Sequence, residues 1–166
     1  MQTNTVVLIG MPGAGKSTLG ILLAKELGLD FIDTDVSIQV REGKTLQHIS
    51  DEKGYLALRD IEEQVLLTEN ITGKVVSTGG SAVYSDAGMA HLKQDSVVVF
   101  LDVPLAELEQ RISNFSTRGI ARRQDQSFDD LFDERSTLYQ RYADIRLDCS
   151  SLSVDEVLQK TLAALA

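Results

Sequence analysis

Residues 10–18 read Gly-Met-Pro-Gly-Ala-Gly-Lys-Ser-Thr, and this stretch decides the fold. Gly10, Gly15, Lys16 and Ser17 match G-x-x-x-x-G-K-[ST], the phosphate-binding loop between a strand and a helix. The glycines let main-chain N–H groups turn toward a phosphate chain. Lys16 places positive charge on the outer phosphates, and the Ser17 hydroxyl is a hard oxygen that suits Mg²⁺. We call residues 10–18 the P-loop and expect a nucleotide there.

The segments on either side of the P-loop have the required character. Residues 5–9 form a continuous apolar run, which is typical of a strand buried on both faces. Residues 16–27 carry leucines at helical spacing and end at Gly28, a helix stop. A glycine-rich turn that happens to precede a helix is the alternative. The full order of strand, loop and helix favours phosphate binding, which the helix amino end strengthens.

Strand and helix patterns alternate along the rest of the chain. Further strands are expected at 30–33, 74–78, 97–102 and 145–148, and helices at 55–70, 86–93, 104–113, 127–142 and 153–165. This alternation predicts an α/β fold with a parallel sheet covered by helices on both faces. Between residues 35 and 70 there is more helix than a simple crossover needs, interrupted at Gly43 and Gly54. We expect a substrate-binding insertion there, near the carboxyl ends of the strands.

Length, charge and cysteine content limit the class of protein. The chain has 166 residues and predicts a single domain, 1–166. Its net charge of −9 argues against nucleic acid or an anionic membrane as the partner, since both need a broad basic surface. No apolar stretch is long enough to span a membrane, and no secretory signal is visible. Cys149 is the only cysteine, which agrees with a reducing cytoplasm.

Two carboxylates follow the second predicted strand, in Asp33-Thr34-Asp35. On an extended segment, side chains at i and i+2 point the same way, here toward the P-loop. Asp33 would hold Mg²⁺ through water, and Asp35 would accept a proton or hydrogen bond from a substrate hydroxyl. The alternative is a polar turn in which Asp35 caps the following helix.

Arginines and glycines elsewhere are candidates for substrate binding. Arg59 is either a bidentate clamp for a carboxylate or an exposed residue that pairs with Glu62 or Glu63. Arg135 is likewise a second clamp or a partner in helix salt bridges. The pair Gly79-Gly80 ends the third strand and permits close approach of a ligand, unless it is a plain tight turn.

The densest basic stretch is 117–123, in a predicted long loop. A loop of this kind is suited to closing over ATP and excluding water. We favour a functional role for Arg118, whereas Arg122 and Arg123 are expected to be solvated.

Taken in order, these motifs resemble those of the shikimate kinase family across nearly the whole chain. The matching residues are 10–18, 33–35, Arg59 with Glu62, Gly79-Gly80, Arg118, and Arg135 followed by Leu-Tyr and Ala-Asp. The resemblance implies a three-layer P-loop NTPase fold with a central five-stranded parallel sheet, a substrate-binding region at about 34–60 and a lid at about 114–126. It also implies ATP-dependent phosphorylation of the 3-hydroxyl of shikimate, with ATP and Mg²⁺ as cofactors. The acceptor would be a small carboxylate-bearing polyol. Oligomeric state is left open, and a monomer is plausible.

The same resemblance assigns roles to residues. It implies that Lys16, Asp35 and Arg118 act in catalysis, and that Ser17 and Asp33 support Mg²⁺. Shikimate would be bound by Asp35, Arg59, Gly79, Gly80 and Arg135. The nucleotide would be bound by Gly13, Ala14, Gly15, Lys16, Ser17, Thr18 and Arg118, with 148–151 near the adenine.

The sequence departs from the family pattern in four places, all on the substrate or lid side. Ser81 stands where the family has a third glycine, Tyr55 where it has Glu, and Leu58 where it has Phe. The family's lid sequence Arg-Pro-Leu-Leu is Arg-Gly-Ile-Ala at 118–121, and loss of the proline predicts a more flexible lid. Two alternatives therefore stay open: a kinase of another small hydroxylated acid or sugar-like metabolite, and a nucleotide-binding regulatory module without efficient phosphoryl transfer.

Overall fold

The computed structural model describes residues 4–112, 119–123 and 125–166. Five parallel strands form one sheet in the order β2-β3-β1-β4-β5. Their bounds are β1 Val6–Ile9, β2 Asp30–Asp33, β3 Lys74–Ser77, β4 Val97–Asp102 and β5 Ile145–Asp148. In the central register, Val7 of β1 lies between Val76 of β3 and Val98 of β4. The predicted α/β fold with a five-stranded parallel sheet is confirmed.

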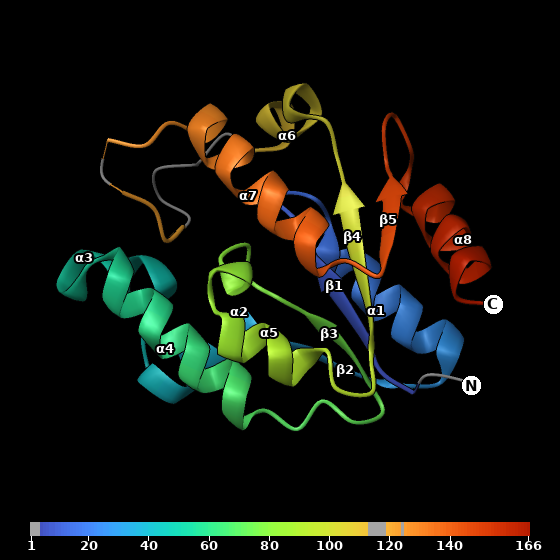
Figure 1. The fold of residues 1–166 in the computed structure, drawn as a ribbon, viewed down its shortest axis with the longest axis horizontal. Helices are drawn as coiled ribbons and strands as arrows, with labels where there is room; N and C mark the ends of the chain where they lie inside the picture. The colour runs from blue at the N-terminus through green and yellow to red at the C-terminus, as the bar shows by residue number, and fades with distance from the viewer. Residues whose placement is uncertain (1–3, 113–118, 124) are drawn as a thin grey trace.

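Helices cover both faces of this sheet. Figure 1 shows α1 (Lys16–Leu27) and α8 (Val154–Leu165) on one side, and α4 (Tyr55–Thr68), α5 (Asp86–Leu92) and α7 (Phe128–Tyr142) on the other. Every residue of β1 is buried, as its continuous apolar run predicts. The three layers thus enclose the main core.

The crossover between β2 and β3 contains three helices. These are α2 (Thr34–Glu42), α3 (Leu46–Lys53) and α4, which are separated at Gly43 and Gly54, where the sequence predicts breaks. They enclose a small core of their own, formed by Ile38, Ile49, Leu58, Val65 and Ala121. Ala121 belongs to the segment after α6 (Leu105–Arg111), so this distant segment is packed onto the crossover.

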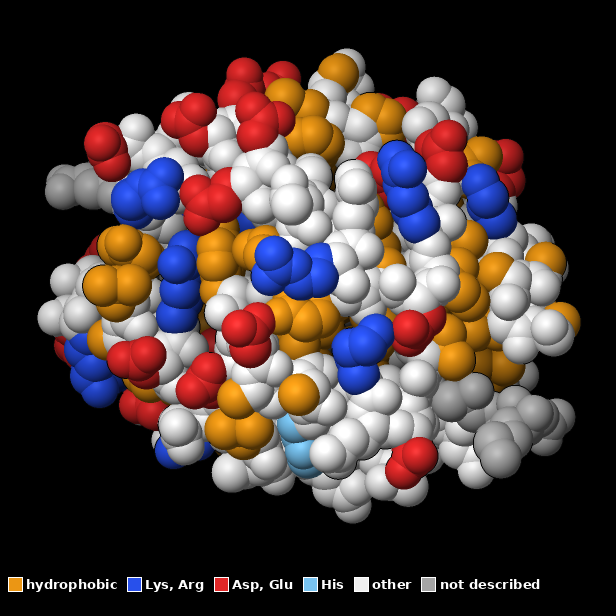
Figure 2. Space-filling model, in the orientation of Figure 1, with side chains coloured by type: hydrophobic (Ala, Val, Ile, Leu, Met, Phe, Trp, Pro, Cys, Tyr) orange, Lys and Arg blue, Asp and Glu red, His pale blue; other side chains and the backbone are white. Residues whose placement is uncertain are grey.

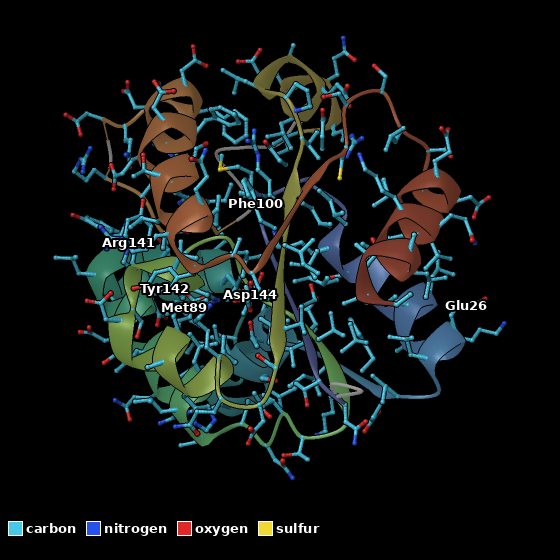
Figure 3. The ribbon with its side chains drawn as sticks, turned by 45° about the vertical axis from the view of Figure 1, so that its right-hand side comes forward. Glu26, Met89, Phe100, Arg141, Tyr142 and Asp144 are labelled. Carbon is cyan, nitrogen blue, oxygen red and sulfur yellow. The ribbon has the colours of Figure 1, made fainter. Side chains whose placement is uncertain are left out.

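Contacts at its carboxyl end hold α7 against the sheet. The ring of Tyr139 packs on Phe100 of β4 with centroids 5.1 Å apart, and Figure 3 shows Phe100 between β4 and α7. The Tyr139 hydroxyl donates to the carbonyl oxygen of Gly80 at 2.6 Å. After the helix, Asp144 accepts from the main-chain N–H of Val98 at 2.9 Å. These contacts set the position of α7 over the strand ends.

The surface is predominantly acidic. Figure 2 shows Asp and Glu side chains along the upper rim, over α6 and α7, where Asp129, Asp130 and Asp133 are exposed. Within the described part of the chain, no helix combines the length and apolar character needed to cross a membrane.

Candidate active site

A cavity of about 360 Å³ opens at the carboxyl ends of the strands. The P-loop forms one end, and side chains from α2, α4 and α7 form the other. Its lining residues are Pro12, Gly13, Gly15, Lys16, Ser17, Thr18, Asp35, Ile38, Leu46, Leu58, Glu62, Thr78, Gly80, Ser81, Arg111, Gly119, Ile120, Ala121 and Arg135. Most predicted site residues therefore meet in one space.

The P-loop leaves an open cradle at the start of α1. Gly15, the residue before α1, has φ 91°, and a Cβ added to it would meet no atom within 4 Å. Among the described residues, no side chain caps this helix end. Its first N–H groups and its dipole are thus available to an anion. The N–H of Ala14 is already used within the loop, because it donates to the carbonyl oxygen of Met11 at 3.0 Å.

Lys16 is folded back over the loop. Its Nζ donates to the carbonyl oxygens of Gly10 at 2.6 Å and Met11 at 2.9 Å. The side chain is only 8% exposed, yet it lines the cavity. This position keeps the ammonium beside the cradle, where it is suited to a phosphate group.

Asp33 links the P-loop to α2. One carboxylate oxygen accepts from the Ser17 hydroxyl at 2.6 Å, and the other accepts from the N–H of Asp35 at 2.9 Å. Ser77, at the end of β3, lies 3.0 Å from the same Ser17 hydroxyl. The prediction that Asp33 and Asp35 share an extended segment is wrong, since α2 begins at Thr34. Asp33, and not Asp35, is the cap.

The oxygens around Ser17 fit Mg²⁺. A hydroxyl and a carboxylate are hard ligands, and Mg²⁺ is usually held by one or two carboxylates with water and phosphate oxygens completing the shell. Over the described residues, no group of three or more His, Cys, Asp or Glu is arranged to hold a metal ion. Ser17 and Asp33 thus suit Mg²⁺ that arrives with a nucleotide.

Asp35 and Glu62 converge above Gly79. A Cβ placed on Gly79 would lie 2.6 Å from Glu62 Oε2 and still closer to Asp35 Oδ1. Glu62 is 4% exposed, and burial, followed by the nearby Asp35 carboxylate, raises the pKa of Glu62 to about 7. At Gly80, an added Cβ would lie 2.7 Å from Arg135 Nη1. The two glycines therefore make room for charged side chains of the site.

Arg59 and Arg135 approach each other around Tyr84. Arg59 Cζ lies 3.7 Å from the centre of the Tyr84 ring, and Arg135 Cζ lies 5.4 Å from it. Both guanidinium groups donate to the carbonyl oxygen of Ala121, at 3.4 Å and 2.9 Å. Burial, with the charge of Arg135 adding to it, lowers the pKa of Arg59. The Nε atoms of both arginines are buried, and neither has a hydrogen-bond partner among the residues that the structure describes.

Neither arginine has the surface pairing that its helix position suggests. In the described part of the chain, no ion pair joins Arg59 to Glu62 or Glu63, or Arg135 to any carboxylate. Arg135 is 1% exposed, and buried charges are normally paired. A buried and a half-buried cation that share one neutral carbonyl make a strong site for an anion.

The segment 119–121 forms part of the cavity wall. Gly119 has φ 71°, and its N–H donates to Gln47 Oε1 at 2.8 Å. A proline at this position has neither that φ nor that N–H, so the change from the family pattern has a local structural reason. Greater lid flexibility stays a prediction. Arg118 lies outside the described residues.

Sequence patterns assign no role in the site to Glu62, Ser81 or Tyr84. The signal for Glu62 is its spacing with Leu58 and Val65, which puts all three on the buried face of α4. Among the other candidates, 148–151 begins at the last residue of β5 and lies outside the cavity lining, so its role near the adenine stays a prediction.

Comparison with known proteins identifies the family. The model described as "Shikimate kinase" matches residues 12–166. Shikimate kinase of Persephonella marina is 33% identical over 162 residues, which cover 96% of this chain and 97% of that protein. A part of Threonine synthase-like 1 of Pongo abelii is 34% identical and covers 98% of this chain but 22% of that protein.

Solved structures agree with this comparison. Shikimate kinase from Acinetobacter baumannii, in complex with shikimate, has a TM-score of 0.87 at 30% identity, covering 99% of this chain and 94% of that one. The enzyme from Aquifex aeolicus has a TM-score of 0.81 at 32% identity, with 96% and 95% covered. A gluconokinase from Sinorhizobium meliloti, at 18% identity and a TM-score of 0.54, shares the fold. By its family match, its relatives and its P-loop, the chain belongs to the shikimate kinase family.

Proposed function

We propose that this protein uses ATP to phosphorylate the 3-hydroxyl of shikimate, forming shikimate 3-phosphate. The observation that carries the proposal is a P-loop cradle at one end of the cavity and, at the other, the buried Arg135 and the half-buried Arg59, which share the carbonyl oxygen of Ala121. A phosphate donor binds at one end, and a carboxylate-bearing acceptor binds at the other. The fold similarity to a shikimate kinase in complex with shikimate supports the identity of that acceptor.

At the acceptor end, the carboxylate of shikimate takes the place of the Ala121 carbonyl between Arg59 and Arg135. Bidentate contacts with guanidinium groups are stronger than contacts with a neutral carbonyl. The ring hydroxyls then lie near Gly79 and Gly80, where Asp35 accepts a hydrogen bond from the hydroxyl that is phosphorylated. This assignment explains why the buried Arg135 and the half-buried Arg59 have no ion-pair partner among the carboxylates of the described residues.

At the donor end, residues 13–18 bind the phosphates of ATP. Lys16 moves from the carbonyl oxygens of its own loop to the outer phosphates and stabilises the charge of the transition state. Mg²⁺, held by Ser17 and Asp33, would neutralise charge on the transferred phosphate. We assign Arg118 to the same task, as part of a lid at about 114–126 that excludes water.

Other expectations remain part of the proposal. They are a single catalytic domain over 1–166 with a substrate-binding region at about 34–60, and a cytoplasmic location without nucleic acid or membrane partners. The buried thiol of Cys149 is compatible with a reducing compartment. Oligomeric state is open, and a monomer is plausible.

The decisive experiment measures ADP release from ATP with and without shikimate, with the product identified by mass spectrometry. We expect shikimate to raise ADP release strongly and to appear as the monophosphate. Release that does not respond to shikimate contradicts the proposal.

A specific observation favours a second candidate. Ser81 carries a side chain at the cavity wall and donates to Glu62, which a third glycine would not do. The same machinery would then phosphorylate another small hydroxylated acid or sugar-like metabolite. A panel of such acceptors in the same assay separates the two, because turnover of another acceptor without turnover of shikimate favours the second. Tight ATP binding with no transfer to any acceptor indicates a regulatory nucleotide-binding module.

A further inference from the structure

The aromatic ring of Tyr84 is a contact that both arginines of the site have in common. Arg59 Cζ lies 3.7 Å from the centre of this ring, and Arg135 Cζ lies 5.4 Å from it. Both distances are within the range, about 6 Å, over which the face of an aromatic ring attracts a cation. Tyr84 itself lies outside the lining of the cavity. It therefore acts on a ligand through the arginines and not by direct contact.

A second aromatic ring also contacts Arg59. Tyr55 lies one turn before Arg59 on α4, and the centre of its ring is 5.0 Å from Arg59 Cζ. The guanidinium group of Arg59 thus has two rings within reach, of which that of Tyr84 is the closer. An aromatic ring holds a cation without neutralising it, because the ring carries no net charge. The charge of Arg59 therefore remains available to an anion.

The Tyr84 residue is held at its main chain and at its hydroxyl. It ends the short helix η1 (Ala82–Tyr84), where its N–H donates to the carbonyl oxygen of Ser81 at 3.1 Å. Its hydroxyl donates to Glu134 Oε1 at 2.8 Å, and Glu134 Oε2 accepts from Gln126 Nε2 at 2.8 Å. Burial raises the pKa of Glu134, but the hydrogen bonds from Tyr84 and Gln126 outweigh it, so the pKa is lowered. Glu134 thus remains an ionised acceptor that fixes the ring.

We propose that Tyr84 is a positioning residue for acceptor recognition, whose ring holds Arg59 beside Arg135 so that both guanidinium groups face the carboxylate of the acceptor. This inference rests on the proposed function. There, the acceptor's carboxylate takes the place of the Ala121 carbonyl that both arginines contact in the free protein. The ring contact does not depend on Ala121, so it keeps Arg59 in position during the exchange. Arg59 needs this support more than Arg135, because Arg59 is half-buried and Arg135 is 1% exposed.

The first test measures kcat, KM for shikimate and KM for ATP in variants of Tyr84. Tyr84→Leu removes the ring and should raise KM for shikimate by about 3- to 30-fold, the effect of losing a cation–π contact in a partly desolvated site. The kcat and the KM for ATP should stay at their wild-type values, since ATP binds at the other end of the cavity. Tyr84→Phe retains the ring and should retain most of the affinity for shikimate. An unchanged KM for shikimate in Tyr84→Leu overturns the proposal.

Tyr142→Leu is the matched control for the loss of a tyrosine ring. Tyr142 is the last residue of α7, its hydroxyl donates to Asp86, and it lies outside the lining of the cavity. This variant should have the wild-type KM for shikimate. A double-mutant cycle then connects Tyr84 to Arg59, because Tyr84→Leu should have little further effect on that KM in an Arg59→Ala background. Effects of the two changes that simply add show that Tyr84 acts independently of Arg59, which overturns the proposal.

A second test needs no acceptor and separates this inference from the proposed function. The buried Nε–H group of Arg59 is followed in ¹H–¹⁵N NMR spectra, and Arg59→Lys identifies its signal. The ring current of Tyr84 should shield this proton, so its signal should move downfield in Tyr84→Leu and stay close to its wild-type position in Tyr84→Phe. An unmoved signal in Tyr84→Leu overturns the role of Tyr84 even if shikimate is turned over. If shikimate is not turned over but the signal moves, the proposed acceptor fails while the positioning of Arg59 by Tyr84 holds.

Discussion

Arg59 and Arg135 donate to one and the same atom, the carbonyl oxygen of Ala121, at 3.4 Å and 2.9 Å. The two arginines lie on α4 and α7, and neither has an ion-pair partner among the described carboxylates. A neutral carbonyl satisfies such charges poorly, because a carboxylate forms shorter and stronger hydrogen bonds. The Ala121 carbonyl therefore marks the position that the acceptor's carboxylate takes in our proposal.

Removing either guanidinium should weaken acceptor binding. Arg59→Ala and Arg135→Ala are each expected to raise KM for shikimate by about 10- to 100-fold, the cost of a charge-assisted hydrogen bond in a buried site. KM for ATP should change little, since ATP binds at the other end of the cavity. Initial rates at varied shikimate and varied ATP measure both constants.

The control for these variants is Arg141→Ala. Arg141 is an exposed residue near the end of α7, the helix that carries Arg135. The Arg141→Ala variant should have the wild-type KM values for shikimate and for ATP. Unchanged KM and kcat/KM for shikimate in Arg59→Ala would show that Arg59 does not bind the carboxylate of shikimate.

Loss of the P-loop lysine should abolish turnover. Lys16→Ala removes the ammonium that lies beside the phosphate cradle, and we expect kcat to fall by at least about 1000-fold. Lys25→Ala is the control, because Lys25 is exposed in the last turn of the same helix. Coupled ADP-release assays compare the two. Substantial activity in purified, folded Lys16→Ala would contradict the assigned role of the P-loop.

The anchor of the 119–121 segment can be tested by hydrogen exchange. Gln47→Ala removes the acceptor for the Gly119 N–H, and the loss of one hydrogen bond should speed its exchange by about fivefold. Asp51→Ala is the control, since it removes the partner of the Gln47 amide nitrogen and leaves Oε1 in place. Equal exchange rates at Gly119 in Gln47→Ala and wild type would show that the bond does not hold this segment.

Burial of Glu62 should make stability depend on pH. Its pKa rises from the ordinary value of 4.5 to about 7 on folding. Between these values the folded protein retains a proton that the unfolded chain has released, so raising the pH favours unfolding. Compared with Glu62→Gln, the wild type should lose about 3 kcal/mol of stability across this interval, with no further loss above it.

Urea unfolding at stepwise pH measures this difference. Glu63→Gln is the matched control, because Glu63 is the next residue of α4, accepts from a serine hydroxyl and is only half-buried. Its stability relative to the wild type should change little over the same interval. A difference in the free energy of unfolding between Glu62→Gln and the wild type that does not change with pH would contradict the raised pKa of Glu62.

Sequence patterns predicted the strand, loop and helix that form the phosphate cradle. The conformation of the P-loop and of its flanking strand and helix depends on contacts between near neighbours in the chain. The sequence motif by itself therefore predicts this local structure. The strand ends differ from the prediction by one residue at most. The two central strands β1 and β4 are largely buried and appear as continuous apolar runs.

The acceptor half was harder to predict. Asp35 was assigned to an extended segment, yet capping by Asp33 starts the helix one residue before it. Arg135 resembles any charged residue on a helix, and only the packing of α7 shows that it is 1% exposed. A charge on a helix does not reveal which surface will cover it, since that surface comes from a distant part of the chain.

The sequence by itself determined the three-layer fold and the position of the phosphate cradle, because these follow from hydrophobic patterns and a local glycine motif. Only the tertiary structure decided the acceptor site. It brings Ala121 to Arg59 across a separation of 62 residues, and joins Ser81 to Glu62 across 19. Such contacts leave no periodic pattern in the sequence, because the packing of the helices over the strand ends determines which group each charged side chain contacts.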